Sequence, residues 1–299
     1  MLCIAIAVYF IIGTIKDYNM EMGDIINNGI FISVVATGAV YIYSGGNFDM
    51  SLGPASLMCA TVAGIVFSHT QNVALTLFCS LAIGITLGVV NAILANVLDL
   101  PVMVMTLTMM NILNAIHAVI LEHNNSSVIP GVGLPNSPVV FATYLVTFFI
   151  LLWVIFNYTK VGRRNKFIGS NSVASKFNGI SLMKSGIISF AISGIGLGLA
   201  GFLFTSSMST PGTEFSTGTV LDTIGLNVVI AIVFGGMTTS GGPRSRVSCA
   251  IIGAFFGVFL DQIFVIAGAE NWKYIAKGLV FLAVSFANMY SSRPKMLAR

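Results

Sequence analysis

The sequence predicts an all-α, polytopic transmembrane protein with about ten membrane spans. Hydrophobic residues make up 56% of the 299 positions and charged residues only 8%, whereas about a quarter of the residues in a soluble domain are charged. Apolar runs of roughly 20 residues, enough to cross about 30 Å of hydrocarbon as a helix, recur along the whole chain. Because these runs are continuously apolar and do not alternate, they favour helices over a β-barrel.

Polar breaks divide the apolar sequence into segments, and each segment is expected to form one span. The predicted spans are 1–15, 25–44, 51–67, 72–97, 101–121, 139–158, 185–205, 224–240, 247–268 and 272–289. The first is short, and we expect it to be retained because no basic residue precedes it and no cleavage site is evident before Lys16. No soluble domain separates the spans, so residues 1–299 are predicted to form a single transmembrane domain.

The orientation of the spans follows from the distribution of basic residues. Segment 160–184 contains six Lys or Arg residues and no Asp or Glu, which predicts that it lies in the cytosol. Counting spans in both directions places Arg244, Arg246 and the basic C-terminal tail on the same side. The acidic segments 122–138 and 206–223 fall outside. Both termini are therefore predicted to be cytosolic, with Lys16 as the one exception to the charge rule.

The sequence argues against an enzyme. It contains no GxxxxGK[ST] phosphate-binding loop and no catalytic dyad, metal cluster or cofactor motif. The four cysteines lie in apolar runs without metal-ligand spacing, at Cys3, Cys59, Cys79 and Cys249. If ATP drives a process in this protein, a partner subunit must bind the nucleotide. The basic pI near 8.9 indicates contact with anionic lipid headgroups and no nucleic-acid partner.

An ion gradient is the alternative energy source, and it usually requires ionisable groups within the spans. We expect only Asp261 and His117 to fall inside spans, while Asp49 and Asp99 lie at breaks between spans. Asp261 is either a coupling acid or an acid beside a water-filled cavity or helix break. His117 is expected to be a packed, hydrogen-bonded histidine. The sequence lacks the cluster of carboxylates that proton or sodium coupling would favour.

Four ordered blocks resemble the membrane subunits of ribose-type ABC sugar importers. They are YSGGNFDMSLGPASL at 43–57, LGVVNAILANVLDLPVMVMTLTMM at 87–110, VGRRNKFIGSNSVASKFNGI at 161–180 and FGGMTTSGGPRSRVSCAIIGA at 234–254. The resemblance implies a permease of the cytoplasmic membrane that imports a monosaccharide or related polyhydroxylated solute. It also implies a second permease subunit in a homo- or heterodimer, two cytosolic ATPase subunits and an extracytoplasmic solute-binding protein.

The basic cytosolic segment contains a predicted short helix. Asn171 or Ser172 is placed to cap a helix that runs towards Phe177, and Gly179 is placed to end it. In the family that the sequence resembles, this is the coupling helix. Ala174 and Phe177 share a face and are expected to fill a cleft in the ATPase. The full set of predicted coupling residues is Gly162, Arg163, Arg164, Gly169, Asn171, Ala174, Phe177, Gly179 and Ile180, with Lys166 helping to anchor the base. The alternative is a purely topological signal.

Two short predicted spans adjoin breaks that share the tripeptide SGG, at 44–46 and 240–242. Broken helices at corresponding positions of two halves indicate a binding region, although tight turns between spans are an equal interpretation. Neutral polar side chains near the breaks and within the spans would suit a hydroxyl-rich solute, although bonds between helices would also use them. The candidate translocation residues are Asn47, Asp49, Ser51, Asn91, Thr106, Asn111, Thr238 and Thr239.

Glycines recur at four-residue spacing in three predicted spans, as Gly84 with Gly88, Gly194 with Gly198 and Gly253 with Gly257. This spacing predicts close helix packing and is compatible with a dimer interface. Two other functions remain open. A stand-alone facilitator or ion-coupled secondary transporter would need no ATPase, and a membrane scaffold would move no solute.

Overall fold

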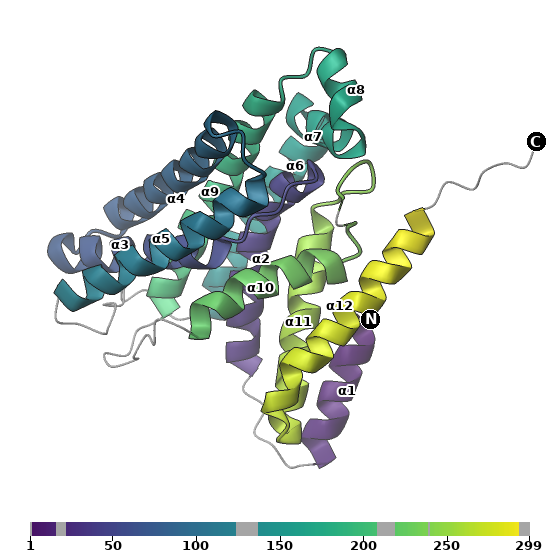
Figure 1. The fold of residues 1–299 in the computed structure, drawn as a ribbon. Helices are drawn as coiled ribbons and strands as arrows, with labels where there is room; N and C mark the ends of the chain where they lie inside the picture. The colour runs from purple at the N-terminus through teal and green to yellow at the C-terminus, as the bar shows by residue number, and fades with distance from the viewer. Residues whose placement is uncertain (1, 16–21, 124–136, 208–218, 239, 293–299) are drawn as a thin grey trace, which may run out of the picture.

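The computed structural model describes residues 2–15, 22–123, 137–207, 219–238 and 240–292, and every regular element in these ranges is a helix (Figure 1). The helices are α1 (Leu2–Ile15), α2 (Met22–Ser44), α3 (Leu52–Thr70), α4 (Val73–Val97), α5 (Val102–His123), α6 (Pro138–Tyr158), α7 (Lys160–Ser170), α8 (Ser172–Phe177), α9 (Leu182–Ser207), α10 (Thr219–Phe234), α11 (Ser248–Ala267) and α12 (Lys273–Ser292), with a 3-10 turn at Glu270–Trp272. The predicted helical fold class is confirmed.

Each predicted span corresponds to a helix, but the helices differ in length and apolarity. Seven of those described are long and apolar enough to cross a membrane, namely α2, α3, α4, α5, α6, α9 and α11. The apolar parts of α1 and α10, Leu2–Thr14 and Gly225–Phe234, are shorter. The predicted eighth span, 224–240, ends early at Phe234 because Gly236 takes a left-handed φ of +91° and the chain turns there.

Helix α2 is the centre of the molecule, and it contacts α6, α7, α9, α10 and α11 (Figure 1). Its residues from Ile30 to Ser44 are all buried. This stretch contains no charged residue. Its polar side chains include Ser33 and Thr37, and the hydroxyl of Thr37 donates to the carbonyl of Ser33 at 2.6 Å. A helix that is apolar on all sides is expected to lie inside a bundle, and α2 does so.

Helices α4 and α9 pack backbone to backbone through two of the predicted glycine pairs. A Cβ on Gly84 would lie 2.3 Å from the carbonyl oxygen of Gly194, and a Cβ on Gly198 would lie 2.6 Å from the carbonyl oxygen of Ser80. The hydroxyl of Ser80 also donates to the carbonyl of Gly198 at 2.7 Å. The prediction that these glycines permit close packing is confirmed, since any larger side chain would separate the two helices.

In the third predicted glycine pair, only one of the two glycines makes a close contact with another helix. A Cβ on Gly253 would lie 1.7 Å from the carbonyl oxygen of Ala231, so this glycine brings α11 against α10. Gly257 has no atom within 4 Å of a Cβ position. Helix packing in the described chain therefore requires a glycine at 253 but not at 257.

Helix α3 begins inside the bundle rather than at its edge. The backbone nitrogen of its residue Gly53 lies 3.4 Å from a Cβ position built on Gly225 of α10. At 1.5 Å per residue, Gly225 stands about 14 Å before the end of α10. The non-helical segment 45–51 therefore runs into the bundle from the end of α2 before α3 starts, as irregular backbone can do where surrounding protein satisfies it.

Candidate functional site

Helix α7 is an element that sequence analysis did not predict. The hydroxyl of Thr159 accepts from the backbone N–H of Val161 at 3.2 Å and caps its first turn. Gly162 permits the sharp step from α6 to α7, because a Cβ there would lie 1.9 Å from the carbonyl oxygen of Phe156. The helix is strongly amphipathic, with Arg163 and Arg164 exposed. This pattern of a capping threonine before an amphipathic segment could have revealed it.

Asn165 fixes α7 to the bundle. Its side chain is buried, and its Nδ2 donates to the carbonyl of Tyr41 on α2 at 3.1 Å and to the hydroxyl of Ser189 on α9 at 2.8 Å. These partners lie more than 20 residues away in both directions along the chain. Because one amide bridges two long helices, a displacement of α7 would be transmitted to both of them.

Lys166 extends the basic surface of α7 towards the turn at residues 241–246. Its ammonium group lies 4.7 Å from the centre of the Phe156 ring, an arrangement that stabilises a cation over an aromatic face. Partial burial, together with the positive charge of Arg246, lowers the pKa of Lys166 from its ordinary value. Segments 160–170 and 241–246 are therefore neighbours in space.

Helix α8 has the cap and the end that its sequence predicts. Asn171 Oδ1 accepts from the backbone N–H of Ala174 at 2.9 Å. Gly179 takes a φ of +77°, and the N–H of Ile180 donates to the carbonyl of Ser175 at 3.0 Å, which closes the last turn with a left-handed residue. The predicted short helix is confirmed. Its coupling role stays a prediction.

An apolar tip covers the outer side of α8 and the end of α7. It consists of the large apolar side chains Phe167, Val173 and Phe177, which are 62%, 63% and 87% exposed. Ala174 is exposed beside them. Figure 1 shows α8 projecting at one end of the bundle. An aromatic side chain as exposed as Phe177, on a segment rich in Lys and Arg, is typical of a surface that another protein covers.

The two SGG breaks meet at the end of α7. The N–H of Gly242 donates to the carbonyl of Ser44 at 3.0 Å, and a Cβ on Gly46 would lie 3.0 Å from the carbonyl oxygen of Ser240. Gly169 packs between them, since its Cβ would lie 2.2 Å from the Ser44 oxygen and 2.5 Å from the Gly242 nitrogen. We call this contact of Ser44, Gly46, Gly169, Ser240 and Gly242 the glycine joint.

Four predicted translocation residues gather around the first break and hold it. Asp49 Oδ1 accepts from the N–H and the hydroxyl of Ser51 at 2.8 and 2.6 Å. Asn91 on α4 donates to the same hydroxyl at 2.9 Å, and Thr106 on α5 accepts from the N–H of Met50 at 3.1 Å. Asp49, Ser51, Asn91 and Thr106 are all buried. The structure therefore brings them together as a hydrogen-bonded support for segment 45–51.

The other predicted translocation residues do not join that cluster. Asn111 is exposed on α5 and donates to the carbonyl of Leu107 at 3.1 Å. Thr238 donates to the carbonyl of Gly241 at 2.8 Å within the second break. Thr239 lies outside the described residues. Asn47 lines a cavity.

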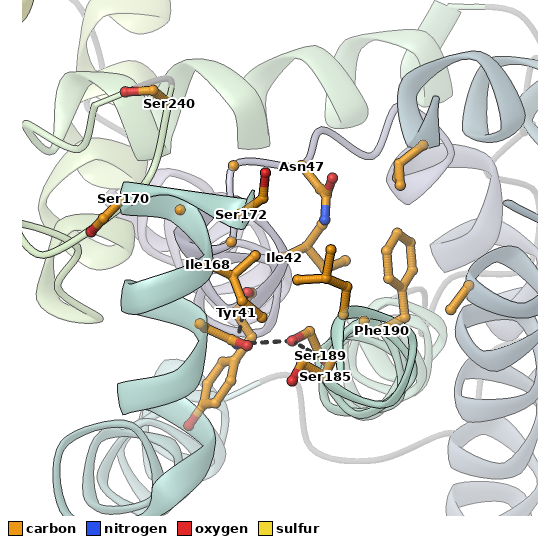
Figure 2. A pocket seen from close by; sticks show the side chains of 18 of the residues that line it. Tyr41, Ile42, Asn47, Ile168, Ser170, Ser172, Ser185, Ser189, Phe190 and Ser240 are labelled. Carbon is orange, nitrogen blue, oxygen red and sulfur yellow. Dashed lines mark hydrogen bonds between the residues drawn. The ribbon is translucent and has the colours of Figure 1, made fainter. Parts of the chain in front are cut away.

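That cavity, of about 550 Å³, lies between the ends of α2 and α4, helix α7 and the first turns of α9. Sequence analysis did not find it, because its walls come from segments far apart in the chain. Figure 2 shows Asn47 and Ser172 extending from one side and Ser185 and Ser189 from another. Among the described residues that line it there is no Asp, Glu, Lys, Arg or His, so these residues offer only neutral polar and apolar contacts.

Asp261, whose side chain is 24% exposed, forms an ion pair that sequence analysis missed. Lys277 on α12 donates to Asp261 Oδ2 at 2.6 Å and to Asn227 Oδ1 on α10 at 2.7 Å, and its side chain is only 3% exposed. The expectation that only His117 and Asp261 are ionisable residues within spans is therefore wrong, because Lys277 lies inside predicted span 272–289. Asp261 is partnered rather than isolated.

His117 is buried on α5 as expected, with 1% of its surface exposed. The expected hydrogen bond is not there, since neither ring nitrogen has a partner among the described residues. In the same part of the chain, no group of His, Cys, Asp and Glu side chains is arranged to hold a metal ion. None of the four cysteines forms a disulfide.

Comparison with known proteins identifies relatives along most of the chain. Residues 22–285 match the model of the family described as branched-chain amino acid transport system / permease component. No solved structure matches the chain.

The chain is similar in sequence to several known permeases, including the following three. The ribose import permease protein RbsC of Escherichia coli K12 is 24% identical over 264 residues, which cover 84% of this chain and 79% of that protein. The protein of the same name from Haemophilus influenzae is 25% identical over 88% of this chain and 83% of its own length. The autoinducer 2 import system permease protein LsrC of Enterobacter sp. 638 is 26% identical over 88% of this chain and 77% of its own length.

Proposed function

This chain belongs to the family of transport-system permease components and is the membrane subunit of an ABC importer; from this premise we propose that it translocates a monosaccharide or a related small polyhydroxylated solute. It is a multi-pass protein of the cytoplasmic membrane. We further propose ten spans with both termini in the cytosol, no ATPase site in the chain itself, and ATP bound by a partner subunit.

The proposed assembly contains two permease subunits, identical or different, with two cytosolic ATPases and an extracytoplasmic solute-binding protein. The main observation behind the proposal is that α8 is exposed while the neighbouring α7 is anchored. Its apolar tip of Phe167, Val173 and Phe177 is exposed, while α7 is fixed to the bundle through Asn165 and Gly169. A partner that binds the tip can therefore act on the spans, since interface anchors are commonly aromatic residues buried in a pocket of the partner.

The proposed mechanism is alternating access. Binding of ATP closes the two ATPase subunits against each other, and this closure displaces α8. Helix α7 then transmits the displacement to the glycine joint. Because the joint contains the ends of both breaks, segments 45–51 and 235–246 move relative to one another and change which side of the membrane the central path faces. ATP hydrolysis resets the cycle. The binding protein delivers solute on the opposite side of the membrane.

The proposed substrate class rests on two observations. The relatives are named for the import of ribose and of autoinducer 2. The polar side chains around the first break are amides and hydroxyls, with one carboxylate that Ser51 already satisfies. Neutral donors and acceptors match a solute that carries hydroxyl groups and no charge.

The ion pair of Asp261 supports the importer over an ion-coupled transporter. Lys277 already neutralises this carboxylate, so the acid is poorly placed to exchange a proton or bind sodium during each cycle. The direct test is uptake of radiolabelled D-ribose into proteoliposomes that contain the permease, its ATPase and its binding protein. The proposal expects uptake that requires ATP on the ATPase side. Uptake that follows an imposed proton or sodium gradient without ATP would contradict it.

A further inference from the structure

The cavity beside the coupling helix has the composition of a binding site for a neutral polar molecule. Its polar lining consists of amides and hydroxyls from Asn47, Asn96, Asn165, Asn171, Ser170, Ser172, Ser185, Ser189 and Ser240. Ile42, Ile168 and Phe190 supply apolar surface on the same walls. A volume of about 550 Å³ falls in the range of small-molecule sites, which combine apolar walls with a few placed polar groups.

Two of these polar groups are available to a ligand. Ser185 is only 7% exposed, yet its hydroxyl forms no hydrogen bond within the described chain. The side-chain amide of Asn47 is equally without a partner there, and Figure 2 shows it extending into the space. A hydroxyl or amide that faces a cavity without a protein partner is free to bond water or a ligand there. These groups stand on α9 and on segment 45–51.

The cavity lies at the cytosolic end of the proposed topology, because Asn171 and Ser172 at the start of α8 form part of its rim. Its inner wall consists of buried residues, including Tyr41, Asn165, Ser189 and Phe190. The absence of charge from the lining disfavours nucleotides, phosphorylated sugars and amino acids, each of which brings a charge that would need a buried partner. Hydroxyl groups, by contrast, match every polar group present.

We propose that this cavity is a cytosolic binding site for a free neutral polyhydroxylated molecule, and that its occupation restrains the coupling helix. A ligand in contact with Ser172, Asn47 and Ser185 would bridge α8, the first break and α9. It would bind best to the conformation in which these three segments are together, and so it would stabilise that conformation. Resting on the proposed function, this predicts that sugar accumulated in the cytosol slows further import.

Gly186 provides a substitution that fills the cavity without disturbing the fold. It lines the cavity, and no atom lies within 4 Å of a Cβ built on it, so Gly186→Leu places a side chain in the empty space. Gly257→Leu is the matched control. Gly257 also lies in a helix with no atom within 4 Å of its Cβ position, but it is on α11 and outside the cavity lining.

The binding test uses the purified full chain in a detergent without a sugar headgroup, with thermal unfolding followed by tryptophan fluorescence during titration with D-ribose, D-xylose or D-galactose. The proposal expects at least one sugar to raise the unfolding temperature saturably in the wild type and in Gly257→Leu. In Gly186→Leu the apparent affinity should fall at least tenfold. An equal response in Gly186→Leu, or no response to any of the three sugars in the wild type, would overturn it.

A second measurement separates a free sugar from a lipid headgroup. Phosphatidylglycerol added to the micelles carries a neutral glycerol in its headgroup, so it serves as the competing probe. Stabilisation by this lipid and not by sugar, lost in Gly186→Leu, would assign the cavity to a lipid and refute the proposal. Sugar binding to the isolated chain requires no ATPase. A failure of this binding is therefore distinct from a failure of the proposed function, which is measured as ATP-driven uptake by the complete transporter.

The regulatory part is tested in proteoliposomes with the complete transporter. Internal sugar on the ATPase side should reduce the rate of ATP-driven uptake in the wild type and in Gly257→Leu. For Gly186→Leu, the rate with internal sugar is compared with its own rate without it, and the ratio should approach one. Equal inhibition in all three proteins would show that inhibition does not arise in this cavity.

Discussion

The backbone N–H of Gly242 donates a 3.0 Å hydrogen bond to the carbonyl of Ser44, and this bond joins the ends of two broken membrane segments. Gly169, at the end of α7, packs against both groups without a side chain between them. Helix α7 and the two breaks are therefore in direct backbone contact. Several measurable consequences depend on this contact and on the hydrogen bonds around it.

Gly169→Ala should damage the glycine joint. Its Cβ would meet backbone atoms of Ser44 and Gly242 at 2.2 and 2.5 Å, and backbone cannot move aside as a flexible side chain can. Overpacking of this kind typically costs about 1–3 kcal/mol. We expect a lower unfolding temperature and loss of solute-stimulated ATPase activity in the assembled transporter. Gly278→Ala, where a Cβ meets no atom within 4 Å, is the control, and equal effects of both changes would refute the joint.

Asn165→Ala should loosen α7 while the rest of the bundle stays folded. The substitution removes the bonds to Tyr41 and Ser189, and loss of buried hydrogen bonds costs about 1–3 kcal/mol. Hydrogen exchange of residues 160–180 should accelerate, with little change in α4. Asn157→Ala is the matched change, since Asn157 is exposed and donates only to Trp153 four residues earlier. Unchanged exchange in Asn165→Ala would contradict the assigned role.

Ser51→Ala should weaken the support of segment 45–51. The hydroxyl donates to Asp49 and accepts from Asn91, so its loss leaves two buried partners incomplete. Ser56→Ala makes the same chemical change on a buried serine of α3, but that hydroxyl donates only to the nearby carbonyl of Gly53. Thermal unfolding should show a larger loss for Ser51→Ala, and the reverse order would count against the network.

Lys277→Met should strongly destabilise the protein, because it leaves Asp261 with an uncompensated charge. Breaking a buried pair by removal of one partner costs about 3–5 kcal/mol, whereas replacing both partners is often close to neutral. Because the Asp261 side chain is 24% exposed, the loss should fall at the lower end of that range. The double substitution Lys277→Met with Asp261→Asn should therefore recover much of the unfolding temperature. It should also retain ATP-driven uptake. Recovery of stability without uptake would revive Asp261 as a coupling acid.

The fold could be predicted from the sequence where neighbouring residues determine the structure. Continuous apolar runs predict the helices, and Asn171 and Gly179 predict the start and end of α8 because capping acts within a few residues. The glycine pairs of α4 and α9 were likewise readable, since only small residues let helices approach so closely.

The site was harder to predict from the sequence, because its contacts join distant parts of the chain. Both SGG breaks are visible in the sequence, but their bond spans residues 44 to 242, and no local pattern reports it. The same holds for Asn165, whose partners are Tyr41 and Ser189. Lys277 was missed because the positive-inside pattern leads one to expect basic residues in loops, whereas this lysine is buried and pairs with the partly exposed Asp261.

The most direct test of the central claim is capture of the ATPase by the apolar tip. The permease is purified from its native membrane as the wild type, as Phe177→Asp and as Ala174→Arg, with Met183→Asp as the control. Met183 is exposed in the first turn of α9, where an acid suits the helix dipole. We predict that a P-loop ATPase co-purifies with the wild type and the control and is lost from both α8 variants. If the ATPase is retained by both variants, or is absent from the wild type, α8 is not the coupling helix and the account is wrong.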